Sequence, residues 1–164
     1  MAKRHIPVAI AYDFDGTLAS GNMQEFEFVP RIGMTTKLFW DEVARLQKHH
    51  EADNILIYMW LMLEKAHAAG VPVRRDDIKR YGATIDLFDG VTEWFDRVNK
   101  YGRENLVKIE HFIISSGLRE MIAGTPIAKN FKSIYASSFL YDENGVAKSP
   151  FENGLTRHLR HHIR

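Results

Sequence analysis

VAIAYDFDGTLAS, residues 8–20, decides the fold class of this chain. Its first part, Val8 to Phe14, is a nearly continuous apolar run, which is typical of a central parallel strand covered on both faces. Asp13 and Asp15 come at the end of that run, and Gly16 then breaks the strand. Two carboxylates one residue apart repel one another and resist desolvation, so we expect a cation between them.

The composition narrows the class of protein. The chain has 164 residues, of which 45% are hydrophobic, enough for one globular core. Lys and Arg number 22 against 21 Asp and Glu, so charge gives no reason to expect nucleic acid or an anionic membrane as a partner. The absence of Cys excludes disulfides, Cys-based zinc sites and thiol nucleophiles. The apolar runs before residue 13 and over 55–63 are too short for a signal peptide or a membrane span, so we expect a cytoplasmic protein.

The middle of the chain, residues 20–86, has the periodicity of helices. Helices are expected over 35–50, over 53–70 with Asp53 as the cap, and over 74–82. A segment this long between two strands must have structure of its own. We therefore predict a helical lobe inserted into an α/β domain.

The rest of the chain alternates strands and helices. The pattern predicts a turn and helix over 87–102, a strand near 110–114, a helical or broken-helical segment over 118–131, a strand over 133–139, and a hairpin turning at 144–145. This order favours a parallel α/β sheet with right-handed crossovers. We assign residues 1–19 and 87–164 to the α/β core and 20–86 to the insert.

The acid pair has a chemical interpretation. Ligands of open α/β sheets bind beyond the carboxyl ends of the strands, where Asp13 and Asp15 are expected to lie. Mg²⁺ takes carboxylate oxygens and water, and it would let a carboxylate approach a phosphate. One acid can then attack phosphorus while the other moves a proton. The alternative is that both are ordinary turn residues at a strand end.

A second motif, HFIISSGL over residues 111–118, places hydroxyls at the end of the second predicted strand. The Ser115 hydroxyl and the backbone N–H groups of Ser116 and Gly117 could form a cradle for a phosphate. The alternative is that the serine pair only caps the helix that follows.

Three stretches of the chain together resemble the haloacid dehalogenase (HAD) superfamily, most closely its phosphoserine phosphatase and pyrimidine nucleotidase branches. They are AYDFDGTL, HFIISSGL and the connecting LFDGV. The resemblance implies a Rossmann-like sheet with a helical cap, and an Mg²⁺-dependent phosphomonoester hydrolase that acts on a small phosphorylated metabolite. Asp13 would be the nucleophile that forms an aspartyl-phosphate, and Asp15 the general acid/base. The Asp13 carboxylate and the Asp15 backbone carbonyl would hold Mg²⁺, and Ser115 would bind the phosphoryl group with the neighbouring amides.

Two motifs of that family are not recognisable. One is the Lys that stabilises the phosphoryl charge, and the other is the distal pair of acidic metal ligands. The available candidates do not have the sequence context that the family shows; they are Lys129, Lys132, Lys148, Asp142, Glu143 and Glu152. We therefore expect a core that is incomplete at its C-terminal side, through truncation or an altered reading frame after about residue 148. The strand over 8–14 would then have an open edge, covered by a second copy or another partner. The alternative function is a catalytically silent module that binds a metal or a protein.

Two further groups of side chains have less specific interpretations. His158 and His162, in a tail rich in Arg and His, have a spacing that could bind a metal on a helix, but a solvated tail is the expectation. The aromatic residues of the helical lobe are expected to form its core, with one or two lining a substrate pocket: Phe39, Trp40, Tyr58 and Trp60.

Overall fold

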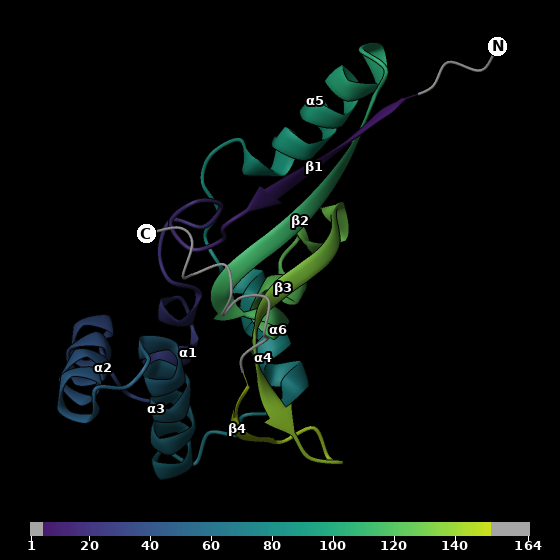
Figure 1. Ribbon diagram of the computed structural model, residues 1–164. Helices are drawn as coiled ribbons and strands as arrows, with labels where there is room; N and C mark the ends of the chain where they lie inside the picture. Colours follow the sequence, from purple (N-terminus) through teal and green to yellow (C-terminus); the bar gives the residue numbers. More distant parts are fainter. Residues whose placement is uncertain (1–4, 152–164) are drawn as a thin grey trace.

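The structure is a computed structural model, and it describes residues 5–151. Its centre is a sheet with the strand order β1–β2–β3–β4 (Figure 1). β1, β2 and β3 are parallel, and β4 is antiparallel to β3. The bounds are β1 Ile6–Tyr12, β2 Val107–Leu118, β3 Phe131–Tyr141 and β4 Ala147–Phe151. The predicted α/β fold is confirmed, and the predicted hairpin supplies its antiparallel strand.

Residues 20–86, which follow β1, form helices as predicted, and we call them the helical segment. Capping explains where its two longest helices begin, because Thr35 Oγ1 accepts from the Leu38 N–H at 3.3 Å and Asp53 Oδ1 accepts from the Ile55 N–H at 2.8 Å. The elements are η1 (Met23–Glu25), α1 (Phe28–Arg31), α2 (Thr36–His50), α3 (Asn54–Ala68), α4 (Arg75–Tyr81) and η2 (Gly82–Thr84). No helix within residues 5–151 combines the length and apolar composition needed to cross a bilayer.

The helical segment occupies one end of the molecule. α2 and α3 lie far from α5 (Val91–Glu104), which covers the sheet at the opposite end (Figure 1). The last helix of the segment, α4, packs tightly on α6 (Arg119–Gly124): a Cβ on Gly124 would lie 1.7 Å from the backbone oxygen of Lys79. The helical segment is therefore joined to the sheet region by backbone-to-backbone contact at this crossing.

A row of hydrogen-bonded side chains lies beneath α5, next to the end of β1. Trp94 Nε1 donates to the Tyr12 hydroxyl at 2.9 Å, and that hydroxyl lies 2.9 Å from His111 Nδ1. His111 Nε2 lies 3.1 Å from Asn99 Oδ1. Because an amide oxygen only accepts, the imidazole proton sits on Nε2 and Nδ1 accepts from the Tyr12 hydroxyl. Burial lowers the pKa of His111, so the ring is held neutral.

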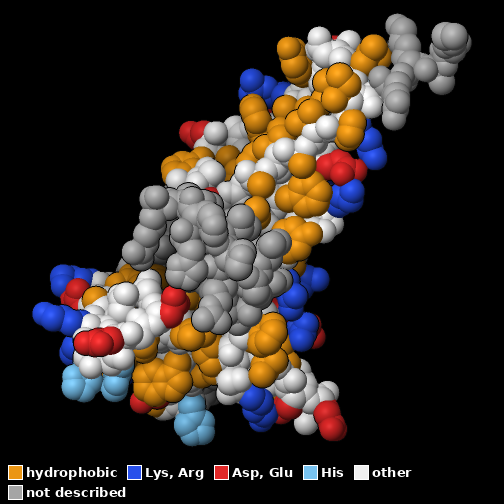
Figure 2. All heavy atoms as spheres, viewed as in Figure 1, with side chains coloured by type: hydrophobic (Ala, Val, Ile, Leu, Met, Phe, Trp, Pro, Cys, Tyr) orange, Lys and Arg blue, Asp and Glu red, His pale blue; other side chains and the backbone are white. Residues whose placement is uncertain are grey.

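One sequence expectation about β1 is wrong. Its apolar residues predicted a central strand covered on both faces, but β1 is an edge strand within the described residues and pairs there with β2. Ile6 is 65% exposed and Val8 is 40% exposed. Figure 2 shows hydrophobic side chains gathered along this part of the surface. The apolar run indicated the strand correctly but not its neighbours, and the incomplete core that the sequence suggested stays a prediction. A partner covering that edge stays a prediction.

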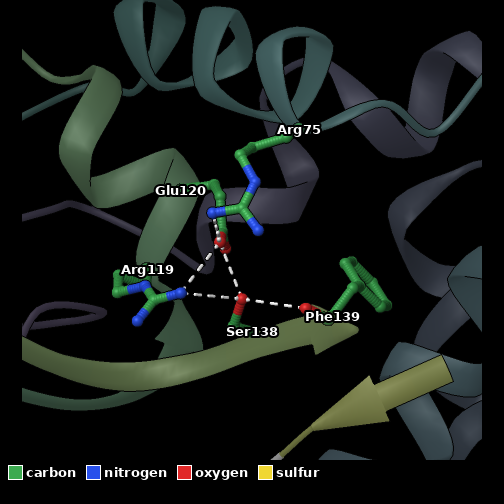
Figure 3. Close-up of polar contacts among 5 residues, drawn as sticks. All are labelled: Arg75, Arg119, Glu120, Ser138 and Phe139. Carbon is green, nitrogen blue, oxygen red and sulfur yellow. Dashed lines mark hydrogen bonds and ion pairs between the residues drawn. The ribbon is translucent and has the colours of Figure 1, made fainter. Parts of the chain in front are cut away.

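An ion-pair network around the buried Glu120 joins α4, α6 and β3 (Figure 3). Glu120 is 5% exposed, and its Oε1 accepts from the Ser138 hydroxyl at 2.7 Å. The same oxygen lies 3.3 Å from Arg119 Nη2 and 3.9 Å from Arg75 Nη1. The Arg75 guanidinium also lies over the Tyr141 ring, 4.3 Å from its centroid. These contacts hold the start of α4 and α6 against β3.

Candidate active site

The first motif forms a tight loop directly after β1. Phe14 is fully buried, and its carbonyl accepts from the N–H groups of Leu18 and Ala19 at 2.8 and 3.0 Å. The loop therefore folds back around a buried aromatic anchor. Asp13 is exposed at its start, and its Oδ1 accepts from the Phe14 N–H at 2.7 Å. Gly16, with φ of 72°, supplies the left-handed conformation that closes the turn.

Asp15 is in a different environment from Asp13. It is mostly buried, and its Oδ1 accepts from the Met23 N–H of η1 at 3.0 Å. Burial raises the pKa of Asp15 to about 7; the Met23 N–H opposes this rise, and the charges of Asp13 and Glu25 add to it. A carboxyl group with such a pKa holds a proton for part of the time at neutral pH, as a general acid must.

The second motif lies at the carboxyl end of β2, beside the first. The register pairs Tyr12 at the end of β1 with Ile113, so the residues that follow both strands share one edge of the sheet. Ser115 is buried, and its Oγ accepts from the Gly117 N–H at 3.0 Å. Ser116 is exposed, and its carbonyl accepts from the Tyr58 hydroxyl of α3 at 2.8 Å. The Gly117 N–H is thus engaged within the motif.

Gly117 is the point where the two motifs meet. A Cβ at this position would lie 2.9 Å from Asp15 Oδ2, and 2.1 Å from Met23 Cε. The Leu118 N–H that follows donates to Met23 Sδ at 3.0 Å. Only a residue without a side chain lets β2 approach the acid and η1 this closely, which gives Gly117 a steric reason independent of phosphate binding.

A cavity of about 250 Å³ opens between the motifs and the helical segment. Its walls include Asp15 from the first motif and Ser116 and Gly117 from the second. Asp13 and Ser115 are not among the lining residues, because Asp13 lies at the exposed start of the loop and Ser115 lies beneath Gly117. The remaining walls come from the helical segment, namely Asn22, Gln24, Trp40, Asn54, Ile55 and Tyr58.

The sequence predicted that one or two aromatic residues of the helical lobe line a pocket, without saying which ones. Of the lobe aromatics, Trp40 and Tyr58 line the cavity, whereas Phe39 is buried and Trp60 is 45% exposed. Trp40 Nε1 donates to Glu25 Oε1 at 2.6 Å, which fixes the indole at the wall. The three amides were not predicted, and nothing in their spacing marks them. Their role follows from where η1 and the start of α3 meet the loop.

The acidic side chains of the site can supply some of the ligands of a hydrated Mg²⁺, but not all of them. Asp13 offers an exposed carboxylate oxygen, and Mg²⁺ commonly binds through one or two carboxylates together with water and substrate phosphate. Residues 5–151 contain no group of three or more metal-binding side chains. Asp142 lies in the hairpin turn, where its carboxylate accepts from the Asn144 and Val146 N–H groups and pairs with Lys148. The donor set therefore fits a loosely held Mg²⁺ completed by the substrate, not a closed protein cage.

The other predicted candidates lie elsewhere. Lys132 pairs with Glu110 on the sheet at 2.7 Å, Lys148 pairs with Asp142 at 2.9 Å, and Lys129 is in η3 (Ala128–Asn130). None of the three lines the cavity. Glu152 and the tail histidines His158 and His162 lie outside the described residues.

Sequence comparisons identify a relative of this chain but no family model. No protein-family model matches the chain. A protein of Borreliella burgdorferi, described as uncharacterized, is 30% identical over 150 residues, which are 85% of this chain and 52% of that protein. The chain thus spans about half the length of the curated relative it matches.

Solved structures match over most of this chain. A HAD family hydrolase from Salmonella enterica serovar Typhi has a TM-score of 0.60 at 12% identity, covering 92% of this chain and 46% of that one. A phosphoserine phosphohydrolase-like protein from Francisella tularensis has a TM-score of 0.54 at 20% identity, covering 98% and 74%. A phospho-aspartyl intermediate analogue of phosphoserine phosphatase has a TM-score of 0.54 at 12% identity, covering 92% of this chain and 64% of that one. This chain therefore has a HAD-like fold, and the resemblance seen in its motifs is confirmed at the level of the fold.

Proposed function

We propose that this chain is an Mg²⁺-dependent phosphomonoester hydrolase that works through an aspartyl-phosphate on Asp13. The observation that carries the proposal is the cavity, because it brings the Asp15 carboxyl group of one motif against Ser116 and Gly117 of the other. A phosphoryl group bound there would meet the proposed proton donor and the second motif, and Asp13, although it does not line the cavity, lies two residues from Asp15 at the end of the same strand. The HAD-like phosphatase fold supports the same assignment.

The residues divide the chemistry between them. An Asp13 oxygen attacks phosphorus and the bond from phosphorus to the leaving oxygen breaks, while Asp15 gives its proton to that oxygen. In the second step water attacks phosphorus, its proton passes to Asp15, and the bond from phosphorus to Asp13 breaks to release phosphate. The Phe14 N–H orients the Asp13 carboxylate throughout. The raised pKa of Asp15 suits a group that must donate a proton and then take one up.

Two features support the assignment of the remaining parts. The Ser115 hydroxyl accepts from the Gly117 N–H and so fixes the turn that carries Ser116 and Gly117 to the cavity; direct contact of Ser115 with a phosphoryl oxygen stays a prediction. When bound at the Asp13 carboxylate and the Asp15 carbonyl, Mg²⁺ would supply positive charge against the developing charge on phosphorus. We assign residues 20–86 as the cap of the site, since η1, α2 and α3 supply the cavity walls that the sheet does not.

Hydrolysis of p-nitrophenyl phosphate by the purified chain tests this function. We expect turnover that requires Mg²⁺, and loss of that turnover in Asp13→Asn with the fold retained by circular dichroism. A protein-bound phosphate that is released by hydroxylamine should form in the native chain and not in Asp13→Asn. Full turnover by Asp13→Asn would show that another group is the nucleophile.

A second candidate function is a catalytically silent module that binds a metal or a protein. Its support is that no Lys among the described residues lines the cavity, and loss of a charge-stabilising group can cost several orders of magnitude in rate. Mg²⁺-dependent turnover that Asp15→Ala removes would exclude this module. Binding of Mg²⁺ without turnover would favour it.

A further inference from the structure

The cavity lies between two parts of the chain. One part supplies the walls that come from residues 22–58, in η1, α2 and α3. The other part supplies Asp15 from the loop after β1, and Ser116 and Gly117 from the end of β2. A movement of the first part against the second would therefore open or close the cavity.

The last stretch of the helical segment, residues 73–86, is paired with the sheet region through its backbone. The Val73 carbonyl accepts from the Ala147 N–H of β4 at 2.9 Å. The Arg75 N–H donates to the Gly145 carbonyl of the hairpin turn, also at 2.9 Å. These bonds add a short extended stretch to the hairpin, so the start of α4 is fixed to it.

α4 and η2 are also packed backbone to backbone on α6. A Cβ on Gly82 of η2 would lie 2.0 Å from the Met121 backbone oxygen of α6, which repeats the close contact of α4 with the same helix. Figure 1 shows α4 beside α6 and apart from α2 and α3. Backbones packed this closely cannot shift without steric overlap, so α4 and η2 form one body with the sheet.

Residues 22–71 reach that body through side chains. The Tyr58 hydroxyl of α3 donates to the Ser116 carbonyl at 2.8 Å, and the Phe28 ring packs edge-on against Tyr81 of α4, with centroids 6.1 Å apart. α3 also packs on β4. Side-chain contacts of this kind can slide or re-form during a movement, whereas backbone pairing has to be broken.

One connection between the two parts is Gly21. The residue before it is held by the sheet region, because the Ser20 N–H donates to the Asp86 carbonyl at 3.0 Å. The residue after it belongs to η1, since the Asn22 carbonyl accepts from the Glu25 N–H at 3.0 Å. The chain thus passes from one part to the other over a single glycine.

The other connection is Pro72. The Val71 N–H donates to the Ala66 carbonyl at 2.9 Å, so the end of α3 holds the chain as far as Val71, and Val73 is already bonded to β4. Pro72 can turn about ψ because its ring fixes only φ, and Gly21 can turn about both angles. Hinge movements are absorbed by a few such residues between rigid parts.

We infer that residues 22–71 form a lid that turns on Gly21 and Pro72, and that residues 73–86 stay with the sheet. The insert expected over 20–86 is therefore divided at Pro72, and only its first part moves. The inference rests on the proposed function for what the lid admits, namely the phosphoryl substrate. The movement itself depends only on the division of contacts.

Distances between pairs of spin labels test the lid. The chain has no Cys, so introduced cysteines are the only sites that a thiol-reactive nitroxide modifies. Lys48→Cys with Arg97→Cys joins α2 to α5, and Asp76→Cys with Arg97→Cys joins α4 to α5 as the matched control; all three native side chains are exposed. Double electron–electron resonance is recorded in EDTA, and again in Mg²⁺ with trifluoroberyllate, which imitates a phosphoryl group on a carboxylate. We expect the mean distance of the first pair to change by more than about 2 Å and that of the control pair to stay constant.

A second arm needs no ligand. Tyr58→Phe removes the hydrogen bond to the Ser116 carbonyl, so we expect the ratio of open to closed populations in the first pair to rise about fivefold, with no change in the control pair. Tyr101→Phe, at a tyrosine of α5 that is 66% exposed, should leave both distributions unchanged. Circular dichroism verifies that each variant is folded.

The two arms separate this inference from the proposed function. A change confined to the first pair, in either arm, supports the lid. Equal changes in both pairs would show that α4 travels with α2 and would overturn the inference, as would a first pair that is unchanged in both arms. Turnover of p-nitrophenyl phosphate by the native chain decides the proposed function independently, because the Tyr58→Phe arm does not require a catalytic site.

Discussion

Asp15→Asn should make the metal-free protein more stable, and increasingly so as the pH rises. The pKa of Asp15 is raised from 3.8 to about 7 in the folded chain, chiefly by burial. The folded state therefore keeps this proton after the unfolded chain has lost it. The stability that Asp15 contributes is fully present below pH 3.8 and is lost as the pH rises toward 7. At 1.36 kcal/mol per pKa unit the whole loss is up to about 4 kcal/mol, of which about 3 kcal/mol falls between pH 5 and pH 8.

The assay is urea unfolding followed by tryptophan fluorescence at pH 5, 6, 7 and 8, with EDTA present because a bound cation would favour the charged carboxylate. The free energy of unfolding of Asp15→Asn minus that of the native chain should grow by about 3 kcal/mol across this range. Neutral His111, with its lowered pKa, contributes stability above pH 6.5 that is lost on acidification; because it is present in both proteins, the subtraction cancels it. Asp96→Asn, which removes an exposed carboxylate of α5, is the matched control and should give a flat difference. A difference for Asp15→Asn that does not change with pH would refute the reasoning.

Three other substitutions follow from close contacts. Gly117→Ala would place a Cβ 2.9 Å from Asp15 Oδ2, so we expect p-nitrophenyl phosphate turnover to fall while circular dichroism stays native. Gly124→Ala would meet the Lys79 backbone oxygen at 1.7 Å, which cannot move aside, and we expect thermal unfolding to show a loss of about 3 kcal/mol. Tyr58→Phe removes the hydrogen bond to the backbone of the second motif, and we expect about 1 kcal/mol lower stability by urea unfolding together with a lower turnover rate. Native-like values for any of these would show that the contact is not maintained in solution.

The parts of the fold that were predicted are those that depend on local chemistry. The Asp53 cap begins α3, and the Asn144–Gly145 turn joins β3 to β4. In each case one short stretch contains both the signal and its structural consequence. β2 was predicted near residues 110–114 but runs from Val107 to Leu118, because pairing with two neighbouring strands extends it beyond its apolar centre. Strand neighbours are a property of the whole chain, which is also why β1 was wrongly placed in the middle of the sheet.

The candidate site divides in the same way. Asp13, Asp15 and the serine pair were named because their residue types at strand ends are chemically unusual. Gln24 and Asn54 carry no such signal, since amides at the start of helices are common and most are solvated. Only the packing of η1 and α3 against the loop after β1 shows that they share a cavity with Asp15. The engagement of the Gly117 N–H by Ser115 Oγ could not be predicted either, because it depends on the backbone turn at the end of β2.

The helical segment does more at this site than cover it. η1 contributes to the environment of Asp15, because the Met23 N–H donates to the carboxyl group, while Gly117 of β2 lies close to its other oxygen. If the segment moved away, Asp15 would become exposed, its pKa would fall toward 3.8, and it would lose its proton at neutral pH. Docking of η1 therefore helps to keep the proposed general acid protonated. Exclusion of water from the cavity and protonation of the acid are then consequences of one contact, so that on the proposed mechanism an open site has no proton to give to the leaving group.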